Sequence, residues 1–94
     1  MSRVDRQFDV EVGRKIKELR LAQGLSQTAL ADALGITYQQ FAKYERGVNR
    51  ISAAQIHLIA SVLQCPIGAF FESLPAVEIK RPLTAAKSVQ PVAA

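Results

Sequence analysis

The segment from residue 38 to residue 46 carries three side chains whose types and spacing suit contacts with a nucleic acid. At about 100° per residue of a helix, Gln39, Lys43 and Arg46 share one face, beside the small Ala42. A glutamine can pair with adenine and a lysine can reach guanine in the major groove, while Arg46 suits a phosphate. A polar outer face is also ordinary for a surface helix, so the elements that present this face must decide between the two interpretations.

The opposite face of the same segment indicates how it would be held in the protein. Phe41, Tyr44 and Glu45 share this face, and Tyr38 and Gln40 lie on the flanks near its N-terminal end. The aromatic side chains suit a hydrophobic core. A carboxylate on the core side needs a partner, because an unpaired buried charge is costly.

A tight turn precedes this segment. One helix is predicted to begin at an N-cap, Ser26, and to end at Gly35, and the next has Thr37 as its N-cap in a Thr-x-x-Gln capping box. Only Gly35, Ile36 and Thr37 separate the two helices, and glycine tolerates the left-handed backbone of such a turn. Two short helices joined in this way are typical of a helix-turn-helix, although small helical proteins that do not bind DNA contain such turns too.

Two longer helices are expected on either side. The first is predicted from an N-cap at Asp9 to about Gln23, with Gly24 closing it. The other begins at Ser52, the N-cap of a second capping box. Apolar residues at helical spacing predict the buried faces of the first, second and fourth helices: Val12, Ile16 and Leu19; Leu30, Ala31 and Leu34; Ile56, Ile59, Ala60 and Leu63.

A fifth helix is predicted after Pro66, a residue that suits the first turn of a helix. Ile67, Phe70, Phe71 and Leu74 fall on one face of it. These four side chains offer more apolar surface than a small core needs. We expect one or two of them to close the core and the others to form a dimer interface.

Length and composition predict a single compact domain, and the helices predicted along the chain make it an all-α domain of five helices over residues 8–74. The chain has 94 residues, of which 49% are hydrophobic. Residues 1–7 are expected to be flexible, and the proline-interrupted residues 75–94 to form a mostly disordered tail. The formal net charge of +4 is compatible with a polyanionic partner and equally with an ordinary soluble protein.

Several classes of function lack the residues they would need. The chain has one histidine, His57, and one cysteine, Cys65, and it contains no zinc-ligand spacing and no glycine-rich phosphate loop. We therefore expect no enzyme activity, no metal and no cofactor. The apolar runs are too short to span a bilayer and the N-terminus lacks a signal peptide's apolar region, so no membrane association and a cytoplasmic, nucleoid-associated location are expected.

The order of these motifs resembles the phage repressor/Cro-type (XRE) helix-turn-helix domain over residues 11–72. The resemblance includes Gly24-Leu25-Ser26-Gln27, Leu34-Gly35-Ile36-Thr37 and Lys43-Tyr44-Glu45-Arg46-Gly47, without gaps between them. It implies a repressor-like DNA-binding fold and a transcriptional regulator that binds double-stranded DNA. A short bacterial subgroup is similar even through residues 43–52.

The resemblance also implies roles for single residues. Tyr38, Gln39 and Lys43 would contact bases. Phosphate contacts would come from Gln27 at a helix N-terminus, from Gln40, and from Arg46, Asn49 and Arg50. Arg20 would pair with Glu45. Tyr38 is bulkier than is usual in the family and Ile51 stands where proline is common, which affects the expected base preference rather than the fold.

The expected assembly is a homodimer on a palindromic operator, acting as a repressor. One module covers too few base pairs to be both tight and specific, and a two-fold dimer places two helices about 34 Å apart in successive major grooves. A second interpretation is a DNA-binding antitoxin or a protein-interaction module whose tail after Leu74 binds a partner protein. A scaffold without DNA affinity would have a neutral face in place of Gln39, Lys43 and Arg46.

Overall fold

The computed structural model describes the backbone of residues 3–74 and the side chains from Asp5 onward. Its elements are α1 (Arg3–Ala22), α2 (Gln27–Leu34), α3 (Tyr38–Arg46), α4 (Ala53–Leu63) and a short 3₁₀ helix, η1 (Ile67–Phe71). The predicted all-α class is confirmed. The predictions made for residues 1–2 and for the tail after Leu74 lie outside the described residues.

The predicted caps of the three short helices are confirmed. The hydroxyl oxygens of Ser26, Thr37 and Ser52 each accept a hydrogen bond from the backbone N–H three residues later, at 3.0–3.1 Å. Gly35 and Gly47 end α2 and α3 with left-handed backbone at φ 72°. The capping box of α4 is only half formed, because the buried Gln55 Oε1 has no hydrogen-bond partner among the described residues.

The prediction for the start of α1 is wrong. The helix begins at Arg3, and Asp9 lies inside it rather than at its N-cap. The Asp9 side chain is buried and accepts a hydrogen bond from Arg50 Nε at 2.6 Å. Phe8, four residues before Val12, extends the apolar stripe backward and packs against the core. Asp9 therefore serves a tertiary contact, which an N-cap preference cannot reveal.

The predicted fifth α-helix is a 3₁₀ helix of five residues. Pro66 is its N-cap, with extended backbone, rather than its first turn, and the helix ends at Phe71. Gly68 lies inside the segment and disfavours a longer helix. Short helical segments of this kind commonly adopt the tighter 3₁₀ form.

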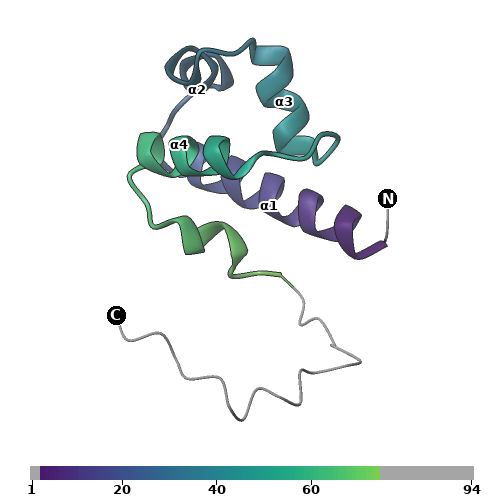
Figure 1. The fold of residues 1–94 in the computed structure, drawn as a ribbon. Helices are drawn as coiled ribbons and strands as arrows, with labels where there is room; N and C mark the ends of the chain where they lie inside the picture. Colours follow the sequence, from purple (N-terminus) through teal and green to yellow (C-terminus); the bar gives the residue numbers. More distant parts are fainter. Residues whose placement is uncertain (1–2, 75–94) are drawn as a thin grey trace.

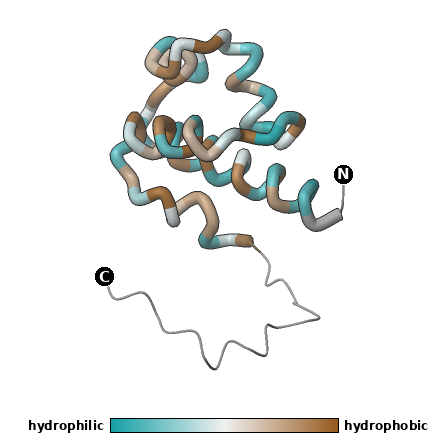
Figure 2. The backbone as a smooth tube through the Cα atoms, viewed as in Figure 1, coloured by the Kyte–Doolittle hydropathy of each residue, from teal (hydrophilic) through white to brown (hydrophobic). Residues whose placement is uncertain are grey.

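The helices surround one hydrophobic core. α1 packs against α3 and η1, and α2 packs against α3 and α4. Figure 1 shows the α2–α3 pair on one side of α1 and η1 on the other. Hydrophilic and hydrophobic residues alternate along each helix in Figure 2, as expected of helices with one buried face. The largest fully buried side chains are Phe41, Phe70, Ile16, Leu30, Ile59, Leu63 and Val12.

The approach of α1 to α3 depends on a glycine. A Cβ at Gly13 would overlap the carbonyl oxygen of Tyr44 and would lie 2.6 Å from that of Glu45. Gly47, at the end of α3, lies against the backbone of Val10 in the same way. The direction of α3 is therefore set by direct backbone contact with α1.

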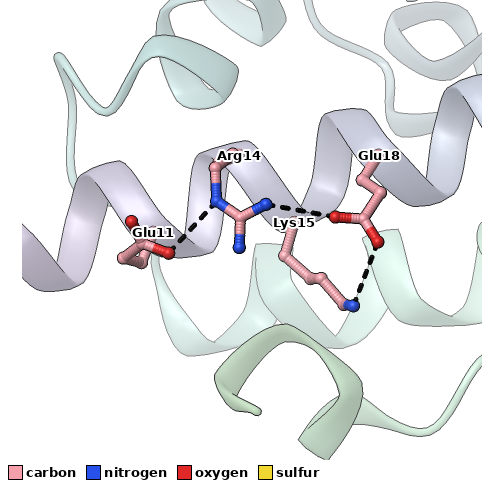
Figure 3. A network of polar contacts seen from close by, with 4 residues as sticks. All are labelled: Glu11, Arg14, Lys15 and Glu18. Atoms are coloured by element: carbon pink, nitrogen blue, oxygen red, sulfur yellow. Dashed lines mark hydrogen bonds and ion pairs between the residues drawn. The ribbon is translucent and has the colours of Figure 1, made fainter. Parts of the chain in front are cut away.

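The exposed face of α1 carries a network of four charged side chains, drawn in Figure 3. Arg14 donates hydrogen bonds to Glu11 and Glu18 at 3.1 Å, and Lys15 donates one to Glu18 at 3.3 Å. The hydrogen bond and charge of Lys15, with a smaller contribution from Arg14, lower the pKa of Glu18. These pairs lie three and four residues apart, the spacing that supports a helix from its surface.

Candidate nucleic-acid interface

The exposed face of α3 is the one that the sequence predicts. Gln39, Lys43 and Arg46 are exposed, whereas Phe41, Tyr44 and Glu45 are buried against the rest of the domain. Within the described residues, Lys43 and Arg46 form no ion pair and no side-chain hydrogen bond. Their charges are thus available to an anionic partner.

The N-terminal end of α3 presents an aromatic ring to solvent. Tyr38, its first residue, is 52% exposed, and Gln40 is half-buried. The Thr37 hydroxyl accepts the Gln40 backbone N–H, so it is engaged in capping. Tyr38 and Gln39 are therefore the side chains that this end of the helix offers to a partner.

A buried ion pair fixes the inner face of α3. Arg20 of α1 donates to both carboxylate oxygens of Glu45, from Nε at 2.6 Å and from Nη2 at 3.1 Å. Its Nη1 donates to the Leu25 carbonyl oxygen at 2.7 Å. This two-bond geometry is the strongest form of a carboxylate–guanidinium pair. The pair is the one implied by the resemblance, and it joins α1, the loop before α2 and α3.

Gln27, the first residue of α2, takes part in the same network. Its Nε2 donates to Glu45 Oε1 at 2.9 Å, and the side chain is half-buried. An amide nitrogen carries two hydrogens, so a second hydrogen bond from Nε2 to a phosphate is compatible with this one. The Ser26 cap satisfies the Ala29 backbone N–H, and the first turn of α2 keeps the partial positive charge of a helix N-terminus.

The loop after α3 holds the two remaining residues expected at phosphates, and they differ. Asn49 is half-buried and forms no side-chain hydrogen bond within the described part of the chain. Arg50 is turned toward the start of α1, where it pairs with Asp9 and, through Nη2, with Asp5 at 3.3 Å. Sequence reasoning missed this cluster because it placed both aspartates at or before the helix start.

The four residues expected at a dimer interface have different environments. Phe70 is fully buried in the core, and the half-buried Phe71 stacks on Phe8 with ring centroids 5.7 Å apart. Leu74 is half-buried and packs against the core. Ile67 is 44% exposed and is thus the member of the set that is open to a partner. Leu58 of α4 is also exposed, at 46%. The sequence pattern does not distinguish it from the other apolar residues of its helix.

Residues 3–74 contain neither a metal site nor a membrane-spanning helix. No three histidine, cysteine or acidic side chains of this part of the chain are grouped as a metal site would need. None of the helices described there combines the length and hydrophobicity needed to cross a membrane.

Comparison with known proteins gives the family. The helix-turn-helix family model HTH_3 matches residues 16–70, more than half of the chain. An uncharacterized HTH-type transcriptional regulator of Sinorhizobium medicae is 43% identical over 68 residues, which are 72% of this chain and 49% of that protein. An uncharacterized HTH-type transcriptional regulator of Rickettsia conorii is 43% identical over 76 residues, which are 81% of this chain and 61% of that protein. The chain thus spans about half the length of the first of these relatives.

Solved structures show the same fold. The restriction-modification controller protein C.AhdI of Aeromonas hydrophila is 34% identical, with a TM-score of 0.63 over 66% of this chain and 94% of that one. An HTH_3 family transcriptional regulator of Vibrio cholerae is 33% identical, with a TM-score of 0.66. The match covers 71% of this chain and 38% of that one. The turn between α2 and α3, the buried face of α3 and these matches agree, and the chain belongs to the helix-turn-helix family of the phage repressor/Cro type.

Proposed function

We propose that the chain is a transcriptional regulator that reads double-stranded DNA with the exposed face of α3. The observation that carries the proposal is the arrangement of Gln39, Lys43 and Arg46 on one solvent-facing side of a helix whose other side is locked to α1. A rigid support matters, because base recognition requires the reading helix to keep one orientation in the groove. The names of the relatives as transcriptional regulators support the same role.

Each residue of the interface has a chemical role in this proposal. Gln39 and Lys43 contact base edges, and the exposed Tyr38 lies at the N-terminal end of the helix, where base contacts of this motif concentrate. Arg46 binds the DNA backbone without discriminating sequence. Further phosphate contacts come from Gln27, Gln40 and Asn49, which lie at the start of α2, on the flank of α3 and in the loop after it.

The proposed assembly is a homodimer on an inverted repeat, acting as a repressor. A single α3 of nine residues spans too few base pairs to select one genomic site. Ile67 and Leu58, the exposed large apolar residues of η1 and α4, supply the proposed contact between copies. Burying them in a dimer would remove apolar surface from water.

Selection of binding sites from random duplex DNA, followed by sequencing, tests the proposal. The expected result is an inverted repeat whose half-sites are about one helical turn apart. Recovery of no motif by the folded protein would contradict sequence-specific binding and favour a protein-binding role.

Two substitutions then test the reading face. Gln39→Ala is expected to cost about 1–3 kcal/mol on the selected site and to relax the preference at one base pair of each half-site. Lys43→Ala should likewise reduce specific binding more than random binding. Lys17→Ala is the matched control, since Lys17 is an exposed lysine of α1 without an ion pair in the described structure. Equal losses for the Lys43 and Lys17 variants would remove Lys43 from the base contacts.

A further inference from the structure

Arg50 lies in a cluster that joins three elements of the protein. Its Nε donates to Asp9 Oδ1 at 2.6 Å, and its Nη2 lies 3.3 Å from Asp5 Oδ1, both on α1. The guanidinium carbon lies 5.7 Å from the centre of the Phe8 ring, within reach of a cation–π contact. Phe8 in turn stacks on Phe71 of η1. The side chain of Arg50 is thus held by neighbours within its own chain.

The charges of this cluster do not favour an anion. The guanidinium already pairs with two carboxylates of α1, so its positive charge is compensated within the protein and attracts a phosphate less than an unpaired cation would. Lys43 and Arg46, by contrast, have no acidic partner within residues 3–74. Of the cations near the reading face, Arg50 is therefore the one whose charge is already compensated.

The same contacts anchor the loop that follows α3. At the start of the loop, Gly47 lies against the backbone of Val10. At its end, Arg50 is bonded to Asp9, the residue before Val10, and Ile51 is buried in the core. Between these anchors lie Val48 and Asn49, and Val48 is 57% exposed. The first turns of α1 thus fix the loop at both ends, with Val48 exposed and Asn49 half-buried between the anchors.

We infer that Arg50 is a positioning residue, which holds Asn49 in place for the DNA backbone and does not itself neutralise a phosphate. The inference rests on the proposed function, and it gives the first turns of α1 a part in DNA binding. It also replaces the phosphate contact that the family resemblance implies for Arg50. Asp9 shares the role, because it is the buried acceptor that orients the guanidinium.

The salt dependence of binding separates positioning from phosphate contact. The binding constant falls as salt rises, so the slope of log K against log salt is negative. Each phosphate neutralised by a cation makes this slope steeper by about 0.9. Binding of the full chain to its selected site is measured over a range of salt for the wild type, Arg50→Ala and Arg46→Ala. For Arg50→Ala we expect about a tenfold loss of affinity, the value of one hydrogen bond to a charged group, with the slope unchanged. For Arg46→Ala the slope should become less steep by about one.

Substitution of Asp9, the acidic partner of Arg50, sharpens the test. A pure charge effect and a positioning role predict opposite changes in DNA affinity for this substitution. Asp9→Ala removes a negative charge, which would strengthen DNA binding if charge alone mattered. If Asp9 positions Arg50, Asp9→Ala weakens binding by about the same factor as Arg50→Ala. Asp9→Asn keeps an oxygen acceptor for Arg50 Nε and should restore binding to near the wild-type level.

All variants are measured at a temperature at which circular dichroism shows them to be folded. A purely structural role would then leave the affinity of Arg50→Ala and Asp9→Ala unchanged, and this result would overturn the inference. A slope that becomes less steep by about one in Arg50→Ala would also overturn it and assign the residue to a phosphate. If the wild type itself selects no site, the proposed function fails, which is a different outcome from either of these.

Discussion

Two ion pairs join α1 to the α3 region, and both have a buried carboxylate 2.6 Å from the arginine Nε, but they differ in the exposure of the arginine. Arg20–Glu45 is buried, makes two parallel hydrogen bonds and also engages Gln27. In Arg50–Asp9 the arginine side chain is 49% exposed, and the buried Asp9 Oδ2 has no hydrogen-bond partner in the part of the chain that the structure describes. The first pair holds α3, the helix proposed to read DNA, and the second holds the loop that follows α3.

This difference indicates that Arg20–Glu45 acts on the stability of the fold and that Arg50–Asp9 acts on the position of the loop after α3. A buried pair with all its partners present is costly to break, because the remaining charge has no water to solvate it. A partly exposed pair loses much of its strength to solvent and salt, so its value lies in fixing a geometry. We therefore expect substitutions in the first pair to act on folding and those in the second to act mainly on DNA binding.

The largest effect is expected from breaking the buried pair. Glu45→Ala leaves the Arg20 guanidinium buried without its carboxylate and should lower the free energy of unfolding by about 3–5 kcal/mol. The double variant Arg20→Met, Glu45→Leu, which replaces both charges by apolar side chains of similar size, should be less destabilised. Urea denaturation followed by circular dichroism measures both. A double variant less stable than Glu45→Ala would show that the pair contributes more than mutual compensation of charge.

The next effect concerns the backbone contact that lies between the two pairs along α1. Gly13→Ala should destabilise the fold by about 1–3 kcal/mol or more, because its Cβ would overlap backbone oxygens at the end of α3 that cannot move aside. Gly68→Ala is the matched control, since a Cβ there meets open space. Thermal unfolding of the two variants compares them. Equal melting temperatures would mean that α1 and α3 can separate without loss of packing.

A smaller effect on stability is expected from Arg50–Asp9, the pair whose arginine is partly exposed. Arg50→Ala should destabilise less than Glu45→Ala, and its loss should shrink at high salt, where the wild-type pair is screened. The Glu45→Ala loss should change little, because a buried pair is screened much less. Urea denaturation at low and high salt gives both values. The comparison between the two pairs fails if salt affects them equally.

The sequence predicts the helix caps and the exposed face of α3 better than the contacts of Arg50, for a physical reason, and it supplies the Arg20–Glu45 pair only through the family resemblance. Caps such as Thr37 and the periodicity of α3 are local, so residues a few positions apart define them. The contact between Arg50 and Asp9 joins residues 41 positions apart, and neither residue type announces it. An aspartate before an apolar stripe indicates an N-cap in isolation, and only the packed structure shows that Asp9 instead accepts from Arg50. The 3₁₀ form of η1 likewise follows from a short segment after Pro66, which its apolar spacing does not reveal.

The smallest effect belongs to the surface pairs of α1 that involve Glu18, whose side chain is 52% exposed. Lys15 and Arg14 lower the pKa of Glu18, so these contacts stabilise the folded state above the ordinary glutamate pKa of about 4.3. The stabilisation is lost as the pH falls through the lowered pKa of the folded state. Glu18→Gln should therefore be slightly less stable than the wild type at neutral pH, and the two should converge in acid. Denaturation curves across this range measure the difference, and a gap that persists undiminished in acid would assign it to helix propensity rather than to charge.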